Sequence, residues 1–308
     1  MRIIFMGNPN FSLPALKKVI ESNHELTSIV SNAPKRMGRG KNKKYTAVGE
    51  YAKRKNISLI HPESLNSKSF SEQLKALKPD LFVIVAYKIL PKSLIEIPQY
   101  GSVNLHASIL PKYRGAGPIQ WALMNGDTLT GITIFQIKPD VDTGDILSQK
   151  KIEIKKEDNM LSLGMRLCTE GAKLLITVID KIENNDIIRI PQKKLGVTLA
   201  PKITKEMTFI DWSWSAKKIH NWVRGLSPFP GMITKYNNKS LILFKTELFP
   251  GKESRIGEVV ISNKKQLVIS TGEGLLSIIE IQLEGKKKLL ISEFLNGNSI
   301  ISGSRLGS

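Results

Sequence analysis

Apolar and polar positions in the first half of the chain form two alternating patterns. Residues 2–6 and 81–86 are short, nearly continuous apolar runs, which are typical of strands buried on both faces of a parallel sheet. Between such runs apolar residues recur at helical spacing, as in 159–182, and Gly, Pro and Asn mark the joints. This alternation predicts an α/β fold with a Rossmann-like, doubly wound and mainly parallel sheet.

The pattern changes near residue 207. A helix is predicted at 211–224, and the segment after it alternates short apolar stretches with turn residues such as Asn and Gly. Five short strands in succession are typical of a small β-barrel. These strands are predicted at 232–236, 241–249, 257–261, 266–270 and 275–282.

The segment between the two halves mixes Pro, Gly and basic residues and shows no hydrophobic periodicity. Such a composition is typical of a connection between domains. We therefore predict a first domain at 1–189, a linker at 190–206 and a second domain at 207–308.

Candidate chemistry begins at a predicted strand in which Val103 and Leu105 alternate with Asn104 and His106. Asn104 and His106 are two residues apart, so they point to the same side of the strand. Polar groups at the carboxyl end of a strand are how open α/β sheets build binding sites. From this spacing alone, a buried structural histidine beside an asparagine that ends the strand fits equally well.

A second segment favours chemistry at that strand. The predicted strand 131–137 is followed by an acid-rich turn that contains Asp142 and closes on Gly144. If the two strands are neighbours, Asp142 can reach the side that carries Asn104 and His106. An amide that stabilises an oxyanion, an imidazole that handles a proton and a carboxylate that orients it form an acyl-transfer set.

Three sequence motifs carry a resemblance to a known family. They are Asn-Leu-His-Ala-Ser-Ile-Leu-Pro at 104–111, Tyr-Arg-Gly-Ala-Gly-Pro-Ile-Gln-Trp-Ala at 113–122 and Asp-Thr-Gly-Asp at 142–145. With them the chain resembles the folate-dependent formyltransferases, and the resemblance covers nearly its whole length. The family usually has Leu where Ile109 stands, an apolar exchange that we expect to be harmless.

The resemblance implies an activity and its participants. A formyl group would pass from 10-formyltetrahydrofolate to the amino group of methionyl initiator tRNA, for translation initiation, with no metal. The resemblance further implies an OB-like second domain that binds tRNA, and three catalytic residues, Asn104, His106 and Asp142. The residues that it places at the reduced folate are Ser108, Ile109, Leu110, Pro111, Tyr87 and Leu90.

The high positive charge of the chain predicts a polyanionic partner. The chain has a formal net charge of +19 and a pI near 9.8, and six of the eleven residues at 34–44 are basic. Arg and Lys interleaved with Gly suit phosphate contacts, although a solvated surface loop and a generally Lys-rich composition are the plain alternatives. The candidate tRNA-binding residues are Arg36, Arg39, Lys41, Lys43 and Lys44.

Other features narrow the class of protein. Cys168 is the single cysteine, so no intrachain disulfide can form, and its apolar helical surroundings indicate packing. Asn8 and Asn10 stand where a dinucleotide fold needs glycine, so we reject NAD binding. The four histidines show no paired metal-ligand spacing. The chain has no signal-peptide pattern and no apolar run of about 18 residues, so we expect a cytoplasmic protein without membrane contact. We also expect a monomer.

Three alternatives remain open at this point. The acceptor could be a small amine on a nucleotide or an amino sugar, which predicts no need for the basic loop or the second domain. Water could be the acceptor, which would make the protein a formyltetrahydrofolate hydrolase. The chain could also be an RNA-binding protein with an inactive first domain, although the intact set of Asn104, His106 and Asp142 argues against this.

Overall fold

The chain folds into two compact units, seen in a computed structural model that describes residues 1–37 and 42–307. The first unit comprises Met1–Pro118, Leu129–Glu153 and Gly164–Ala200. The second unit starts at Pro201 and also includes two earlier segments, Ile119–Thr128 and Ile154–Leu163. Each unit therefore gathers pieces that are separated along the chain.

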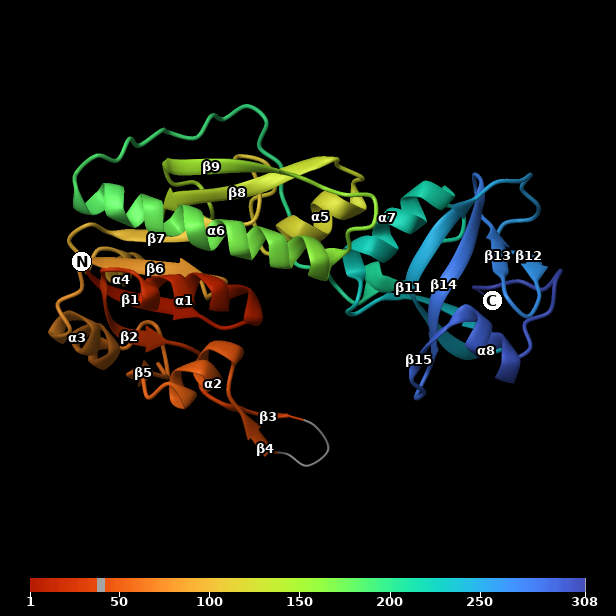
Figure 1. Ribbon diagram of the computed structural model, residues 1–308, viewed down its shortest axis with the longest axis horizontal. Helices are drawn as coiled ribbons and strands as arrows, with labels where there is room; N and C mark the ends of the chain where they lie inside the picture. The colour runs from red at the N-terminus through yellow and green to blue at the C-terminus, as the bar shows by residue number, and fades with distance from the viewer. Residues whose placement is uncertain (38–41, 308) are drawn as a thin grey trace. The chain divides into compact units, whose positions relative to one another are not determined.

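A seven-stranded sheet forms the centre of the first unit, with the strand order β5-β2-β1-β6-β7-β8-β9 (Figure 1). Neighbouring strands from β5 to β7 pair in parallel, whereas β8 is antiparallel to both β7 and β9. The predicted mainly parallel α/β fold is thus confirmed, with β8 as the exception. The strands are β1 (Arg2–Gly7), β2 (Glu25–Val30), β5 (Leu59–Ile60), β6 (Leu81–Val85), β7 (Ser102–His106), β8 (Leu129–Gln136) and β9 (Ile146–Glu153).

Helices of the first half begin where the sequence offers caps. The Thr46 hydroxyl accepts a hydrogen bond at the start of α2, and the Ser67 hydroxyl does the same at the start of α3. The short α4 was not predicted, because four residues are too few to show helical periodicity. The helical segments are η1 (Asn10–Ser12), α1 (Leu13–Glu21), α2 (Ala47–Arg54), α3 (Lys68–Ala76), α4 (Lys92–Ile95), α5 (Pro118–Met124) and α6 (Met160–Glu183).

Helix α6 packs closely on the strand that carries the candidate site. A Cβ atom at Gly171 would lie 2.8 Å from Cδ1 of Leu105, a separation that only a shift of one partner could relieve. Leu105 is 3% exposed, and every residue of β6 beside it is buried. The glycine therefore lets the helix hold β7 firmly against the core.

The basic segment predicted as a loop contains a two-stranded antiparallel hairpin, β3 (Lys35–Met37) and β4 (Asn42–Lys44) (Figure 1). Lys35 lies opposite Lys44, and Arg36 lies opposite Lys43. The prediction of an unstructured loop was wrong for these residues, because a hairpin with basic side chains at most positions shows no apolar alternation.

A six-stranded antiparallel sheet forms the second unit, with the order β10-β11-β14-β13-β12 and β15 paired with β14. All five predicted strands are confirmed, and β15 escaped prediction because lysines precede it. The elements are η2 (Glu206–Thr208), α7 (Ala216–Leu226), β10 (Met232–Tyr236), β11 (Lys239–Phe249), β12 (Val259–Ser262), β13 (Leu267–Ser270), β14 (Leu275–Leu283), β15 (Lys288–Leu290) and α8 (Ile291–Gly297).

Helix α7 starts later than the predicted 211. Its cap is Ser215, whose hydroxyl accepts from the Lys218 backbone, whereas the Asp211 carboxylate accepts from the backbone and hydroxyl of Ser213 in a preceding turn. Asp211 therefore organises a turn and does not cap the helix. The sequence alone could not show this, because Asp and Ser are both common helix caps.

The early segments of the second unit are part of its core. Met124 is 3% exposed and belongs to the same buried cluster as Ile219 and Val223. A Cβ atom at Gly225 would lie 2.6 Å from Cγ of Met124, so α7 approaches this residue closely. The core of the second unit is therefore built from both halves of the sequence.

Candidate functional site

The two strands predicted to share the site are neighbours. Asn104 pairs in register with Phe135, and His106 pairs with Thr133. His106 is 6% exposed, while Asn104 is partly exposed. No residue in the described part of the chain makes a hydrogen bond to the Asn104 side chain, so its amide is available to a ligand.

The imidazole of His106 lies between a carbonyl and a carboxylate. Its Nε2 atom is 2.9 Å from the carbonyl oxygen of Tyr113, and its Nδ1 atom is 3.6 Å from Oδ2 of Asp142. Because a carbonyl only accepts hydrogen bonds, Nε2 carries the hydrogen of that bond. A proton that reaches Nδ1 therefore meets the carboxylate of Asp142, which stabilises the charged ring.

Asp142 is held in an uncommon backbone conformation. Its φ of 53° lies in the left-handed region, which Asp tolerates better than most residues. Its Oδ2 atom accepts from the Gly115 backbone at 2.8 Å. Two residues on, a Cβ atom at Gly144 would lie 1.6 Å from the carbonyl oxygen of Gln136, so only glycine fits there. The turn thus delivers the carboxylate to His106 at fixed geometry.

The segment that precedes Pro201 lines this site. The Thr198 hydroxyl accepts from the Tyr113 backbone at 2.8 Å, and the backbone of Arg114 pairs with that of both Thr198 and Ala200. Gln192 reaches the Asp142 turn and the Arg114 side chain. These residues fall within 190–206, the predicted linker, and sequence reasoning assigned them no part in the site because the segment lacks both periodicity and a motif.

The four residues predicted to contact folate in the 104–111 motif form a fixed turn. The Ser108 side chain is buried, and its hydroxyl donates to the Lys112 carbonyl at 2.6 Å. Leu110 is 2% exposed, and its backbone donates to the Thr133 hydroxyl. Ile109 and Pro111 are partly exposed. Ser108 and Leu110 therefore shape the turn, while Ile109 and Pro111 keep part of their surface accessible.

Tyr87 and Leu90 lie beyond the end of β6. Leu90 is 4% exposed and belongs to a buried core cluster, and Tyr87 packs against the same cluster. The Tyr87 hydroxyl is buried without a hydrogen-bond partner among the described residues, and burial raises its pKa to about 12. Tyr87 is therefore neutral at physiological pH and retains an unused donor.

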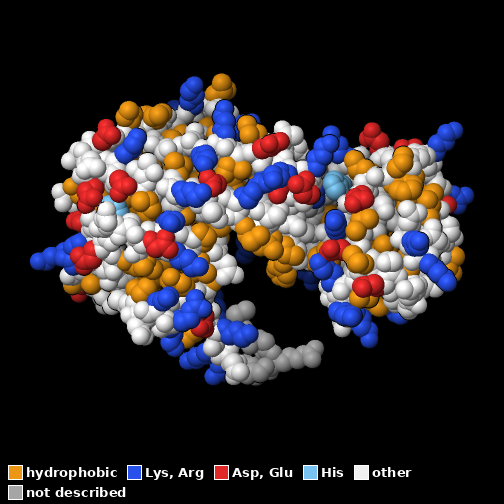
Figure 2. Space-filling model, in the orientation of Figure 1, with side chains coloured by type: hydrophobic (Ala, Val, Ile, Leu, Met, Phe, Trp, Pro, Cys, Tyr) orange, Lys and Arg blue, Asp and Glu red, His pale blue; other side chains and the backbone are white. Residues whose placement is uncertain are grey.

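The described candidate tRNA-binding residues are exposed. Arg36, Lys43 and Lys44 project from the β3–β4 hairpin and, within the described chain, form no ion pair with a carboxylate. Arg39 and Lys41 lie outside the described residues. Lys and Arg side chains gather around this hairpin in the space-filling view (Figure 2).

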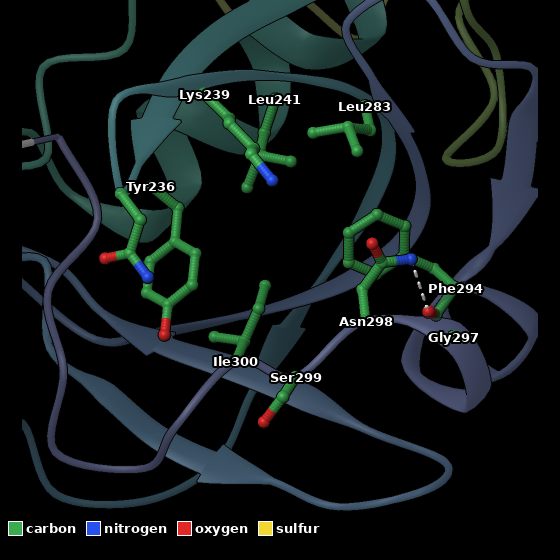
Figure 3. A pocket seen from close by; sticks show the side chains of 10 residues that line it. Tyr236, Lys239, Leu241, Leu283, Phe294, Gly297, Asn298, Ser299 and Ile300 are labelled. Carbon is green, nitrogen blue, oxygen red and sulfur yellow. Dashed lines mark hydrogen bonds between the residues drawn. The ribbon is translucent and has the colours of Figure 1, made fainter.

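A cavity of about 260 Å³ lies in the second unit (Figure 3). Tyr236, Leu241 and Phe294 form part of its wall, and Lys239 and Asn298 are among its polar groups. The described residues that line it include no imidazole or carboxylate. It therefore lacks the imidazole and carboxylate that the site at His106 combines.

The described residues form no group of three or more His, Cys, Asp or Glu side chains placed to hold a metal ion. Cys168 is buried, and burial raises the pKa of its thiol, as expected for a packing residue. No helix in the described ranges is both long and apolar enough to cross a membrane.

Comparison with known families identifies two matching regions. The formyl transferase model matches residues 1–179, and the model of the formyl transferase C-terminal domain matches residues 202–299. A curated relative, methionyl-tRNA formyltransferase of Caldanaerobacter subterraneus subsp. tengcongensis, is 40% identical over 99% of this chain and 100% of its own.

Solved structures share the fold at lower identity. HypX from Aquifex aeolicus in complex with tetrahydrofolic acid has a TM-score of 0.67 and 20% identity over 96% of this chain, which spans about half (47%) of that protein. An N-formyltransferase from Helicobacter canadensis, in complex with folinic acid and dTDP-3-aminofucose, has a TM-score of 0.66 and 20% identity, over 93% of this chain and 99% of its own.

Proposed function

We propose, from the premise that this chain belongs to the formyl transferase family, that it formylates the amino group of methionine on initiator tRNA, for translation initiation. The observation that carries this proposal is the free amide of Asn104 on the same strand as His106, whose ring lies 3.6 Å from the Asp142 carboxylate. The acceptor is supported by the relative that is 40% identical from end to end.

The donor in this proposal is 10-formyltetrahydrofolate. Solved structures of the same fold bind tetrahydrofolic acid or folinic acid, which supports a folate-derived formyl group. Ile109, Pro111 and the partly exposed side chain of Tyr87 would meet the folate directly, whereas Ser108 and Leu110 would fix the turn. Leu90 would support Tyr87 from the core. These residues offer mainly apolar surface, which suits a flat heterocycle.

The proposed reaction is an acyl transfer through a tetrahedral intermediate. The methionyl nitrogen bonds to the formyl carbon, whose oxygen gains negative charge, and the bond from that carbon to the folate nitrogen then breaks. Asn104 donates its amide hydrogen to the oxyanion. His106 provides a second donor or the proton that the leaving nitrogen takes. Asp142 holds His106 and, through water, helps to remove the proton of the attacking amine.

The β3–β4 hairpin is proposed to bind the acceptor through phosphate contacts. Lys35 faces Lys44 and Arg36 faces Lys43, and like charges directly opposite each other destabilise a strand pair. A polyanion placed between such side chains removes the repulsion and releases its own counterions. Arg39 and Lys41 extend the proposed set. Residues 207–308 would hold a further part of the tRNA, and we place the protein in the cytoplasm as a monomer.

A small-amine acceptor is the main alternative. The sugar-bound formyltransferase from Helicobacter canadensis matches this chain across both units, so the presence of a second unit does not separate the two acceptor classes. The basic hairpin favours tRNA, because the single diphosphate of a nucleotide sugar is too small to neutralise four exposed cations on two strands, whereas tRNA offers many phosphates. With water as acceptor the product would be free formate, and an inactive site would give no product.

One assay tests the proposal. The protein is supplied with 10-formyltetrahydrofolate and, in parallel, with methionyl initiator tRNA, free methionine, an amino sugar nucleotide or no acceptor. We expect formyl-methionyl-tRNA at a rate at least about a hundredfold above any other product. Formate release without acceptor would identify a hydrolase, a formylated sugar would identify the small-amine alternative, and no turnover would indicate an inactive site.

A further inference from the structure

We infer that Gln192 is a positioning residue that sets the geometry of Asp142 for formyl transfer. The inference rests on the proposed function, because it assigns Asp142 a part in the reaction. Gln192 lies outside the three sequence motifs, in a segment whose composition predicted only a connection between domains. Its side chain nevertheless joins two loops of the site.

The amide of Gln192 uses all of its hydrogen-bonding capacity within the site. Its Nε2 atom donates to the carbonyl oxygens of Asp142 and Gly144, each at 2.8 Å. Its Oε1 atom accepts from Nε and Nη2 of Arg114, at 3.2 and 2.7 Å. A primary amide has two donor hydrogens and two acceptor lone pairs, so none remains for a substrate. Gln192 therefore acts through its neighbours.

These contacts fix a backbone that would otherwise be disfavoured. Asp142 has a left-handed φ of 53°, a conformation that is less favourable than the helical or extended regions even for Asp, so contacts that hold it are needed. Gln192 fastens the turn on both sides of Thr143, through the carbonyls of residues 142 and 144. On the opposite loop, Arg114 precedes Gly115, whose N–H binds the Asp142 carboxylate. One amide thus holds the carboxylate turn and the loop that receives it.

A side chain of similar size cannot replace the Gln192 amide, because it would not provide the same donors and acceptor. Gln192→Glu has almost the same shape, and its carboxylate would bind Arg114 at least as well. It would lose both donors and would place negative charge against two carbonyl oxygens. Gln192→Glu therefore separates the contact with Arg114 from the contact with the turn, and Gln192→Ala removes both.

The effect should appear in turnover and not in substrate binding. A small displacement of a group that acts in the transition state costs about 10- to 100-fold in rate. We therefore expect kcat to fall by that factor in Gln192→Ala and Gln192→Glu. The KM values for tRNA and folate should stay within about twofold, because Gln192 has no free hydrogen-bonding group to offer either substrate. Gln282→Ala, at an amide that caps the Lys286 carbonyl in the second unit, provides a matched control.

A double-mutant cycle distinguishes positioning from general support. If Gln192 acts through Asp142, then Gln192→Ala should cost less than about threefold when added to Asp142→Asn. Equal losses in both backgrounds, or a raised KM with unchanged kcat, would overturn the inference. If the unmodified protein forms no formyl-methionyl-tRNA, the proposed function fails at once, before any variant is compared.

A second measurement does not depend on activity. Hydrogen exchange at the Gly115 amide reports its bond to the Asp142 carboxylate. We expect exchange at Gly115 to accelerate about tenfold or more in Gln192→Glu, with no change at amides of β6. Unchanged Gly115 protection in both Gln192 variants would show that the turn holds its geometry without this residue, and the inference would be wrong.

Discussion

Two loops of the first unit carry charge in opposite ways. In the turn that follows β8, the Asp142 carboxylate is 14% exposed, receives the Gly115 N–H at 2.8 Å and lies 3.6 Å from the His106 ring. In the β3–β4 hairpin, Arg36 and Lys43 face each other in solvent, and within the described chain neither forms an ion pair. One loop is fixed by internal hydrogen bonds, and the other is exposed and self-repelling.

The difference reflects when each loop meets its partner. A group that stabilises a transition state is most effective if it is already oriented, since no reorganisation is then needed during the reaction. A group that captures a polyanion gains more from remaining solvated and unpaired until the ligand arrives. The internal contacts of each loop thus indicate its proposed task more directly than its residue types do.

Removing the charge at Asp142 should produce the largest effect. Asp142→Asn keeps an oxygen that can accept from Gly115, so we expect the fold to persist while kcat falls about 100- to 10,000-fold. Single-turnover formylation measures the loss, and the thermal midpoint and tRNA affinity serve as controls. A folded variant within about threefold of the unmodified rate would exclude Asp142 from the chemistry.

Part of this site could be predicted from the sequence, and part could not. The two-residue period of a strand is enough to place Asn104 and His106 on the same side of β7. Asp142 follows β8, which pairs with β7. Their roles remain predictions. Gln192 and Thr198 carried no signal, because a side chain that bonds to distant backbone groups needs neither periodicity nor a motif.

Neutralising the hairpin should have the next largest effect. With Lys35, Arg36, Lys43 and Lys44 replaced by Ala, we expect weaker tRNA binding and unchanged kcat at saturating tRNA. For every phosphate that the variant no longer neutralises, the slope of log affinity against log salt should fall by about 0.7 to 0.9. Equilibrium binding at several salt concentrations measures this slope.

A charge-matched control uses four exposed lysines elsewhere in the chain. Its members are Lys68, Lys75, Lys92 and Lys181. Replacing them with Ala removes the same net charge while leaving the hairpin intact. Equal changes in slope for the two variants would mean that only net charge matters, and the hairpin would then have no specific contact with tRNA.

The smallest effect should come from a single reversal in the hairpin. Lys43→Glu turns the repulsive pair with Arg36 into an attractive one, which should stabilise the strand pair by about 0.2 to 1 kcal/mol. We expect slower hydrogen exchange in β3 and β4 together with weaker tRNA binding, and Lys43→Gln should lie between. Tighter tRNA binding in Lys43→Glu would show that rigidity matters more than charge at this hairpin.

Elements of the fold were predictable in proportion to how they are buried. β1 and β6 lie inside the sheet, and their apolar runs identified them directly. The strands β3 and β15 have only three residues each and lie beside runs of basic residues, so their pairing left no hydrophobic pattern. The start of α7 was predicted too early because Asp211 and Ser213 are suitable caps as well as Ser215, and only the three-dimensional contacts distinguish the three residues.

The discontinuous second unit has a consequence for synthesis. Met124 packs with Ile219 and Val223, which are translated almost a hundred residues later. At roughly 5 to 20 residues per second, its partners follow after about 5 to 20 s. A nascent chain of this protein therefore carries an uncovered apolar segment throughout that time, including a short interval after the first unit is complete at Ala200. Chaperone contact during that interval should centre on residues 119–128.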